Sequence, residues 1–320
     1  MSAVRWPAVI ERDQTARVLR GAPAAAAVLT AIAARAAQLR AARLVPTLAI
    51  ITVGDDPASA VYVRKKGEAC EAAGLAHRRV VLPTSASATD VRHAIRSTCD
   101  DRGVHGVIVQ LPLPRGLDGH AFLGEVDPAK DVDGLSPASL GALAAERPTF
   151  VAATPLGIAL LLRYHGIQVV GQHVAVVGRS VLVGRTLAQL LSLRRPGFNA
   201  TVTLCHSGTR DLAALTRTAD IIVSATGVPG TITAAHVGMG ATVVDVGTTR
   251  VEDPSRPGRF LLVGDVLADQ VAAVAGALTP VPGGVGPMTV ACLLANTVYA
   301  ADPTRGPIGP IADLLGASAP

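Results

Sequence analysis

The segment His173-Val-Ala-Val-Val-Gly-Arg-Ser-Val-Leu-Val-Gly184 limits what this chain can fold into more than any other. It predicts a short, fully apolar strand that ends at Gly178 and a helix that begins after Gly184. Such a junction begins the nucleotide site of doubly wound α/β domains, because backbone N–H groups must approach phosphate closely at a helix N-terminus. Its glycines do not follow the usual G-x-G-x-x-G spacing, however, and similar junctions occur in sheets that bind no ligand.

Apolar runs recur after this junction at intervals that leave room for a helix between them. They lie at residues 201–205, 221–224, 241–245 and 259–263. Strands that alternate with helix-length segments are typical of repeated βα units, so this half of the chain predicts a parallel sheet.

The first half of the chain alternates in the same way. We expect strands at residues 48–54, 79–82 and 104–110, and helices at residues 22–43, 57–73 (capped by Asp56), 88–99 and 118–125. Further helices are expected at residues 156–164 and 288–299. The fold class is therefore α/β, with two α/β domains and the active-site cleft between them. Residues 1–151 and 288–320 form the first domain, and residues 152–287 form the second, a Rossmann-like parallel sheet.

The composition suits such sheets and argues against a nucleic-acid partner. Of the 320 residues, 49% are hydrophobic but only 2% are aromatic, so aliphatic side chains must fill the core, as they do in parallel sheets covered by helices. The net charge of +5 comes from scattered arginines without interleaved aromatic rings. That distribution favours the attraction of small anions over the binding of nucleic acid.

Cysteine usage and the apolar stretches predict a cytoplasmic protein that does not bind a membrane. Cys70, Cys99, Cys205 and Cys292 form no C-x-x-C pair, so we expect neither a metal site nor a disulfide framework. The first twenty residues carry charges throughout and lack the apolar core of a signal peptide. Residues 271–301 carry no charge, but their prolines and glycines would interrupt a membrane-spanning helix.

Lys66 occupies an unusual place in the predicted helix 57–73. Tyr62, Lys66, Ala69 and Ala73 follow one another at spacings of 4, 3 and 4, so the lysine lies on an otherwise apolar stripe. One interpretation is a lysine whose ammonium group extends past a packed stem into solvent. The other is a partly desolvated amine with a lowered pKa, able to exchange a proton near neutral pH.

Polar residues with two interpretations also follow the third predicted strand. Gln110 lies at the carboxyl end of that strand, where ligands bind in open α/β sheets. Asp131 and Asp133 then precede Gly134 as the first acids of a calcium loop would, but the later ligands and the closing glutamate are absent. Formation of a turn is the alternative for both acids.

The cofactor half indicates NADP in preference to NAD. NAD-type sites place an acid at the end of the second strand, where it accepts a hydrogen bond from the ribose 2′-hydroxyl. Here strand 201–205 is followed by His206-Ser-Gly-Thr-Arg210, with no acid before Asp211. Arg179 and Ser180 lie on the first turn. Arginine and hydroxyl groups without a carboxylate suit a 2′-phosphate.

Taken together, these motifs resemble one family, the bifunctional methylenetetrahydrofolate dehydrogenase/methenyltetrahydrofolate cyclohydrolases. The most specific matches are Lys130-Asp-Val-Asp-Gly134 and Pro280-Val-Pro-Gly-Gly-Val-Gly-Pro-Met-Thr289. The other matches, in the family's order, are Val53-Gly-Asp-Asp-Pro-Ala-Ser-Ala-Val-Tyr-Val-Arg-Lys-Lys66, Gln110-Leu-Pro-Leu-Pro114, Thr154-Pro-Leu-Gly157, Gly178-Arg-Ser-Val-Leu-Val-Gly184, Ala200-Thr-Val-Thr-Leu-Cys-His-Ser207, Asp245-Val-Gly247 and Gly264-Asp-Val266.

The resemblance implies a role for each candidate residue. Lys66 becomes the catalytic lysine, Tyr62 stacks on the folate, and Gln110 tunes Lys66. Asp133 anchors the pterin, whereas Asp131 is structural. The implied folate contacts are Tyr62, Lys66, Val109, Gln110, Leu111, Asp133, Pro282, Gly283 and Gly284. The implied NADP contacts are Gly178, Arg179, Ser180, Gly184, Ser207 and Thr248. No metal is implied.

The resemblance also implies the chemistry. Hydride passes from 5,10-methylenetetrahydrofolate to NADP⁺, and water then converts the methenyl product to 10-formyltetrahydrofolate. A homodimer formed through the cofactor domain is implied as well. Departures from the family's usual residues occur in or near the cofactor domain, at Ala153, Thr186, Gly208, Val228, Thr248 and Thr249. They concern cofactor preference and dehydrogenase rate more than folate binding.

Three alternatives remain open from the sequence alone. One is a different NADP dehydrogenase on a similar two-domain scaffold, such as a shikimate-type or amino-acid dehydrogenase. It would not need Tyr62, Lys66, Gln110 and Asp133 together with the glycine-proline loop, which is the motif at residues 280–289. Another is a catalytically silent protein that binds folate or NADP. The third is a dehydrogenase with a weak cyclohydrolase activity.

Overall fold

The structure, a computed structural model, describes residues 16–54, 57–253, 255–256, 258–302 and 304, without the side chains of residues 57–59 and 61. The chain divides into two compact units. Among the described residues, 16–25 and 154–289 form one, called the six-stranded unit, and those of 26–153 and 290–304 form the other, called the three-stranded unit. Helices α1 (Gly21–Ala41) and α10 (Val285–Ala301) each contribute residues to both units. The expected capping by Asp56 lies outside the described residues.

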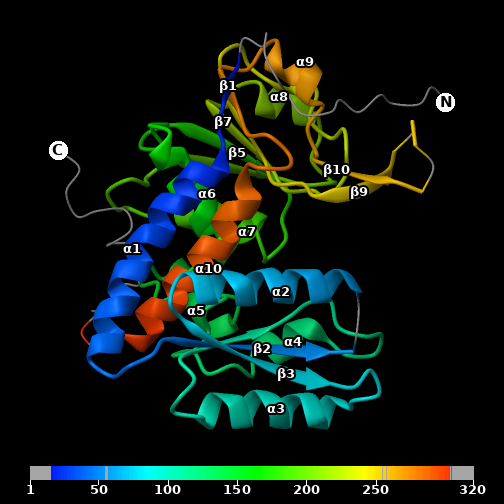
Figure 1. The fold of residues 1–320 in the computed structure, drawn as a ribbon. Coiled ribbons are helices and arrows are strands. Elements are labelled where there is room, and N and C mark those ends of the chain that lie inside the picture. The colour runs from blue at the N-terminus through cyan, green and yellow to red at the C-terminus, as the bar shows by residue number, and fades with distance from the viewer. Residues whose placement is uncertain (1–15, 55–56, 254, 257, 303, 305–320) are drawn as a thin grey trace. The chain divides into compact units, whose positions relative to one another are not determined.

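The three-stranded unit contains a parallel sheet in the order β3-β2-β4, formed by β3 (Ala76–Leu82), β2 (Thr47–Val53) and β4 (Gly106–Val109). Every residue of β2 is buried, because β2 is central and both of its faces are covered. Figure 1 shows α2 (Pro57–Ala72) and α3 (Ala88–Asp100) on opposite sides of this sheet. The unit also contains α4 (Gly119–Leu123) and α5 (Pro137–Ala144).

Local sequence signals explain where two of these helices begin. Ser87 caps α3, accepting from the Asp90 backbone N–H, while the Asp90 side chain accepts from the Ser87 backbone in return. This reciprocal pair satisfies two of the backbone donors that a helix start leaves free. Helix α5 was not expected, although Ser136 caps it and Pro137 stands in its first turn. Those two residues are a recognisable helix start.

The six-stranded unit is built on a parallel sheet in the order β1-β11-β8-β7-β5-β6. Strand β5 (His173–Val177) is the expected strand before Gly178, and β6 (Thr201–Cys205), β7 (Ile221–Ser224) and β8 (Thr242–Asp245) follow the expected runs. The unit's helices are α6 (Ala153–Tyr164), α7 (Gly184–Leu191), α8 (Leu212–Thr216), η1 (Ala234–His236) and α9 (Ala268–Ala272). Because β6 and β7 flank β5 on opposite sides, the strand order reverses at β5, which is where dinucleotides bind in such sheets.

At one edge of this sheet, the structure departs from the domain boundaries expected from the sequence. Strand β1 (Arg17–Val18) pairs in parallel with β11 (Ala277–Leu278), so residues 16–25 belong to the six-stranded unit and not to the unit that contains Lys66. The backbone N–H groups of Arg17 and Leu19 donate to carbonyl groups of residues 276 and 278, at 2.9 and 2.8 Å. Two-residue strands carry no periodic signal, which is why neither strand was predicted.

The expectation that residues 259–263 belong to the parallel sheet is wrong. Strand β10 (Phe260–Val263) instead pairs antiparallel with β9 (Thr249–Glu252), and the two form a separate hairpin. The segment between Glu252 and Phe260 is too short for the crossover that parallel neighbours need, whereas antiparallel strands accept a short turn. The hairpin extends away from the main sheet (Figure 1).

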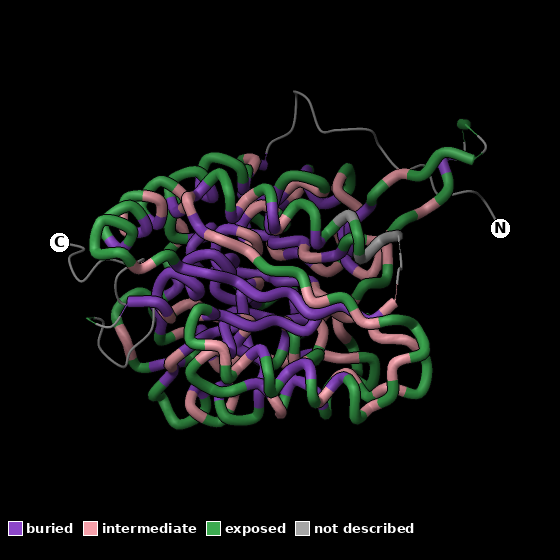
Figure 2. The backbone as a smooth tube through the Cα atoms, turned by 60° about the horizontal axis from the view of Figure 1, so that its bottom comes forward, coloured by how far each residue is buried: buried purple, intermediate pink, exposed green. Residues whose placement is uncertain are grey.

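Burial follows the sheets. Figure 2 shows the central strands as almost continuously buried, while helices alternate between buried and exposed turns. In length and composition α1 would suffice to cross a bilayer, with a mean hydropathy of 1.3 over 18 residues, of which 33% are buried. Its buried residues Val28, Ile32, Ala36 and Leu39 recur every three or four positions. That spacing is typical of a helix packed along one side in a globular protein.

Asn296 supports the turn that carries the paired acids. It lies in α10 with no exposed surface, and its Nδ2 donates to the carbonyl oxygens of Val132 at 2.7 Å and Val151 at 3.0 Å. The two carbonyl groups are therefore satisfied by one buried amide in an otherwise apolar stretch of helix. A buried acceptor that loses its donor costs about 1–3 kcal/mol.

We expect Asn296→Ala to lower the free energy of unfolding of the three-stranded unit by about 2–4 kcal/mol, since two buried acceptors lose their donor and a small cavity appears. Urea unfolding followed by circular dichroism measures this. Thr297→Val is the matched control, because the Thr297 hydroxyl donates to the Leu293 carbonyl one turn back in the same helix, at 2.9 Å. Equal losses in the two variants would contradict the assignment.

Candidate active site

The side chains of Lys66 and Gln110 meet in the three-stranded unit. Lys66 Nζ, from α2, donates to Gln110 Oε1 at 2.9 Å. Gln110 follows β4, as expected, and its Nε2 donates to the Leu111 carbonyl at 2.7 Å. This second bond fixes the orientation of the amide, because it keeps the amide oxygen turned toward the lysine.

The environment of Lys66 favours the neutral amine. Burial lowers the pKa of Lys66, while the negative charge of Asp133 opposes that decrease. Burial in turn raises the pKa of Asp133, and Lys66 opposes that rise. Of the two interpretations of Lys66, the structure therefore favours the desolvated amine over an ammonium group free in solvent. Cys70 itself is buried, and burial raises its pKa to about 12, so it is an unreactive thiol.

The paired acids Asp131 and Asp133 separate into different roles. Asp131 is buried, and its carboxylate accepts from the backbone N–H groups of Leu135 and Ser136 and from the Ser139 hydroxyl, at 3.3, 2.8 and 2.6 Å. The Asp131 carboxylate therefore stabilises the turn that leads into α5. Asp133 keeps part of its surface open to solvent. Among the described residues, no group of acids, histidines and cysteines could hold a metal ion.

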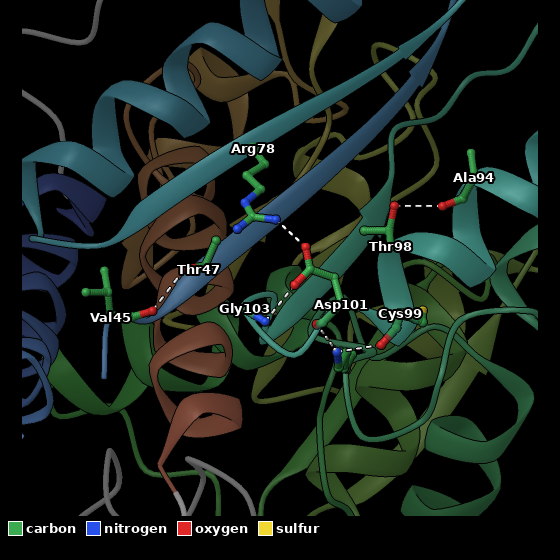
Figure 3. A network of polar contacts seen from close by, with 9 residues as sticks. Val45, Thr47, Arg78, Ala94, Thr98, Cys99, Asp101 and Gly103 are labelled. Atoms are coloured by element: carbon green, nitrogen blue, oxygen red, sulfur yellow. Dashed lines mark hydrogen bonds and ion pairs between the residues drawn. The ribbon is translucent and has the colours of Figure 1, made fainter. Parts of the chain in front are cut away.

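Backbone and lysine contacts hold this turn rigid. Lys130 Nζ donates to the carbonyl groups of Cys99 and Asp101 at 2.5 and 2.8 Å. The Asp101 carboxylate, shown in Figure 3, accepts from the Gly103 backbone and from Arg78. Gly134 has φ +65°, and a Cβ there would lie 2.6 Å from backbone atoms of residues 151 and 152. The position of Asp133 is thus set from several directions.

The other expected folate residues of this unit differ in exposure. Tyr62 lies one helical turn before Lys66, and 55% of its surface is exposed, so its ring is free to stack on a planar ligand. Val109 is buried at the end of β4, and Leu111 is partly exposed. A groove of about 410 Å³ between α2 and β3 lies elsewhere: Arg64, Glu68, Glu71 and His77 are among its lining residues, but Lys66 is not.

In the six-stranded unit, Gly178 and Gly184 form a compact turn. Gly178 has φ +117°, and a Cβ on it would overlap the Ala225 carbonyl oxygen. A Cβ on Gly184 would overlap the carbonyl oxygen of Gly178. Only glycine fits at either position, so the turn keeps backbone close to the start of α7, where a phosphate could approach. Arg179 and Ser180 are exposed on this turn.

Thr186, at which the resemblance implies a proline, closes the turn with its side chain. Its buried hydroxyl donates to the Val181 carbonyl at 2.5 Å and so ties the first turn of α7 to the loop before it. The turn therefore remains closed without the fixed φ of a proline.

The loop after β6 offers donors to a 2′-phosphate. Ser207, Gly208 and Arg210 are exposed there. The nearest acid, Asp211, caps α8 by accepting from the Ala214 backbone at 3.0 Å. That carboxylate is thus engaged in the helix cap, and the residues present fit NADP. Thr248, after β8, is exposed as well.

The glycine-proline loop belongs to the six-stranded unit; its residues 280–284 precede α10, and its residues 285–289 form the first part of that helix. Pro282 and Gly283 are exposed, whereas Gly284 is buried. The Gly283 carbonyl accepts from the Gly21 backbone at 2.8 Å, and a Cβ on Gly21 would overlap the Gly284 carbonyl oxygen. The loop is therefore anchored at one end of α1.

Comparison with known proteins identifies both halves of the chain with the same family. The model of the tetrahydrofolate dehydrogenase/cyclohydrolase catalytic domain matches residues 19–133, and the model of that family's NAD(P)-binding domain matches residues 152–305. A curated relative, the bifunctional protein FolD of Acidiphilium cryptum, is 48% identical over 290 residues, which cover 91% of this chain and 99% of the relative. The corresponding protein of Parvibaculum lavamentivorans is 46% identical, over 90% and 96%.

Comparison with solved structures leads to the same family. The bifunctional methylenetetrahydrofolate dehydrogenase/cyclohydrolase of Campylobacter jejuni is 37% identical, with a TM-score of 0.83, over 89% of this chain and 98% of that one. The Trypanosoma brucei enzyme, solved with NADP cofactor and inhibitor, is also 37% identical with a TM-score of 0.83, over 89% and 97%.

The charge coupling between Asp133 and Lys66 can be measured. Asp133→Asn should lower the pKa of Lys66 further, because the Asp133 carboxylate raises it. The chain has only three lysines, Lys65, Lys66 and Lys130, so NMR titration of lysine side chains can follow Lys66 once Lys66→Met has assigned its signal. A Lys66 pKa that stays constant or rises in Asp133→Asn would overturn the coupling.

Proposed function

Because the chain belongs to the tetrahydrofolate dehydrogenase/cyclohydrolase family, we propose that Lys66, Gln110 and Asp133 carry out its folate chemistry. The protein oxidises 5,10-methylenetetrahydrofolate to 5,10-methenyltetrahydrofolate with NADP, and it hydrolyses that product to 10-formyltetrahydrofolate. The observation that carries the assignment of residues is the contact of Lys66 Nζ with Gln110 Oε1, in a segment that matches the family's catalytic domain.

Lys66 serves as the proton carrier of the hydrolytic step. Water adds to the methenyl carbon, a C–O bond forms, and the neutral amine takes a proton from that water. As the bond from this carbon to N5 then breaks, the amine returns that proton to N5, and the second proton of the added water leaves to solvent as the C=O bond forms, which leaves the formyl group on N10. A group that exchanges protons efficiently needs a pKa near the working pH, and burial moves the pKa of Lys66 in that direction.

Gln110 and Asp133 prepare Lys66 and the substrate. Gln110 accepts a hydrogen bond from the amine and so directs Nζ. Asp133, held by its rigid turn, accepts from N–H groups of the pterin ring and orients it. Tyr62, Val109, Leu111, Pro282, Gly283 and Gly284 complete the folate contacts. Exposure of the Tyr62 ring and of Pro282 and Gly283 supports this assignment.

Gly178, Arg179, Ser180, Gly184, Ser207 and Thr248 bind NADP. When bound, NADP⁺ accepts the hydride that leaves the methylene carbon. The glycine pair admits the pyrophosphate close to the backbone, and Arg179 with Ser207 contacts the 2′-phosphate. The absence of an acid between β6 and Asp211, whose Oδ1 caps α8, supports NADP over NAD, because NAD-type sites place a carboxylate there to accept from the ribose 2′-hydroxyl.

The experiment that tests this function is an assay with methylenetetrahydrofolate and either NADP⁺ or NAD⁺, in which NADPH and the methenyl product are followed separately. We expect NADP-dependent formation of both products and their conversion to 10-formyltetrahydrofolate. No product above a control without enzyme would leave only a binding role. Equal turnover with the two cofactors at low concentration would refute the preference for NADP.

Lys66→Met should lower the hydrolysis of methenyltetrahydrofolate at least about a hundredfold, since the proton carrier is lost. The measurement is the decay of methenyltetrahydrofolate absorbance in the absence of NADP. Lys65→Met is the matched control, because Lys65 is exposed on the same helix and should be neutral. Hydrolysis by Lys66→Met at the unchanged rate would show that the lysine is wrongly assigned.

We also propose that the enzyme is a cytoplasmic homodimer. The hairpin β9–β10 stands apart from the main sheet, and two-stranded hairpins are marginally stable in water. Phe260 and Leu262 on it are 49% and 38% exposed, with the Arg250 guanidinium 4.4 Å from the Phe260 ring centroid. A second copy of the chain would cover these groups. The four free cysteines fit a reducing compartment.

Phe260→Glu should shift the protein from dimer to monomer, because a charge would be buried in the interface. Sedimentation velocity measures the change. Met239→Glu is the control, since Met239 is 84% exposed in the same unit but lies outside the hairpin, and that variant should remain dimeric. A wild-type protein that sediments as a monomer would refute the dimer.

A further inference from the structure

Two aspartates that the proposed function does not use are buried at the carboxyl edge of the six-stranded sheet. Asp245 is the last residue of β8 and is 4% exposed, and Asp265 follows β10 and has no exposed surface. Acidic side chains are almost never fully buried unless partners compensate for lost hydration. The hydrogen bonds of the two carboxyl groups therefore indicate their role.

Asp245 ties together the segments that follow β8 and β10. Its Oδ1 accepts from the backbone N–H groups of Gly247 and Asp265, both at 2.9 Å, and its Oδ2 accepts from that of Val266 at 3.0 Å. Each oxygen of the carboxylate thus faces a backbone donor. Burial raises the pKa of Asp245 to about 7, although these three donors oppose the rise.

Asp265 accepts hydrogen bonds from the end of β7 and from the loop that follows it. Its Oδ2 accepts from the Thr226 backbone N–H at 2.6 Å and from the Ser224 hydroxyl at 3.1 Å, and its carbonyl accepts from the Ile232 backbone at 3.2 Å. Among the residues that the structure describes, its Oδ1 has no hydrogen-bond partner. The two carboxyl groups together connect three loops that are far apart in sequence.

Glycines allow this close packing. A Cβ on Gly264 would overlap Asp245 Oδ2, and a Cβ on Gly247 would overlap Asp265 Oδ1. The D-V-G and G-D-V motifs therefore form one interlocked unit, in which each aspartate packs on the glycine of the other motif.

The three loops lie where one half of a dinucleotide must bind. The strand order reverses at β5, and the adenosine ribose of a bound dinucleotide lies at the end of the second strand, here β6. The other half of the cofactor therefore extends across the ends of β7 and β8. Thr226 and Thr231, whose hydroxyls are 3.1 Å apart, close the loop after β7, and Thr249 Oγ1 donates to the Gly227 carbonyl in that loop at 3.2 Å.

We propose that Asp245 and Asp265 are positioning residues that fix the loops after β7 and β8 against the nicotinamide half of NADP. They act through backbone N–H groups and do not touch the cofactor themselves. The inference rests on the proposed NADP site, but direct binding of NADP tests it independently of turnover.

The sharpest test compares one chemical change at both positions. In Asp265→Asn the amide oxygen can keep accepting from Thr226 and Ser224, while its NH₂ group takes the place of the oxygen without a partner. In Asp245→Asn the NH₂ group must face a backbone N–H whichever way the amide turns. We therefore expect Asp265→Asn to bind NADP within about threefold of wild type, and Asp245→Asn to bind it at least about tenfold more weakly.

Asp265→Ala removes the acceptor altogether and should resemble Asp245→Asn. The measurements are calorimetric titration with NADP, the dehydrogenase KM and kcat, and hydrolysis of methenyltetrahydrofolate without NADP. In Asp245→Asn and Asp265→Ala, NADP binding and the KM for NADP should change, while hydrolysis stays within about twofold. Thermal unfolding identifies any variant that fails to fold, and the folded Asp265→Asn variant keeps the comparison informative.

Two results would overturn the proposal. One is equal NADP affinity in folded Asp245→Asn and Asp265→Asn. The other is a parallel decrease of NADP binding and hydrolysis, which marks a general loss of structure. A wild-type protein that binds NADP but turns over no folate would refute the proposed function alone, since the comparison of NADP affinities would still decide the positioning role.

Discussion

The hydrogen bond between Lys66 Nζ and Gln110 Oε1 is the contact on which the chemistry of the three-stranded unit depends. An amine in this position must lose hydration to become a useful base, yet it still needs a polar partner that does not fix it in the charged form. A carboxylate in place of Gln110 would stabilise the ammonium group strongly, whereas a neutral amide oxygen accepts from either protonation state. The negative charge of Asp133 acts in the opposite sense to burial, so the proton affinity of Lys66 reflects a balance between the two.

Much of the fold is predictable because its strands are short, apolar and fully covered. Residues 221–224 were predicted as a strand and form β7, and the junction at Gly178 was expected from the sequence alone. The hairpin β9–β10 was mistaken for part of the parallel sheet because an apolar run does not reveal the direction of its partner. Strands β1 and β11 were missed because they are defined by backbone pairing, and residue type has little influence on that pairing.

The candidate site was predictable to a different degree at each residue. Lys66 stood out because helical spacing placed a charge among apolar residues. The structure shows that Asp131 is the structural acid of the Asp131–Asp133 pair, because its carboxylate accepts three hydrogen bonds. The local sequence does not encode the distances of those hydrogen bonds. Asn296 was overlooked, although an amide within the apolar run of α10 was a signal that a buried backbone needed a donor.

The pairing of β1 with β11 has a consequence for how this chain can be divided. The six-stranded unit is assembled from two stretches of sequence, because residues 16–25 supply its last strand. A fragment cut out at residue 152 would contain the whole match to the NAD(P)-binding domain but would expose the backbone of β11 along one edge. An uncovered parallel edge recruits other chains. A single cut therefore cannot separate the two units, and a cofactor unit made alone must carry residues 16–25 joined to residues 154–289.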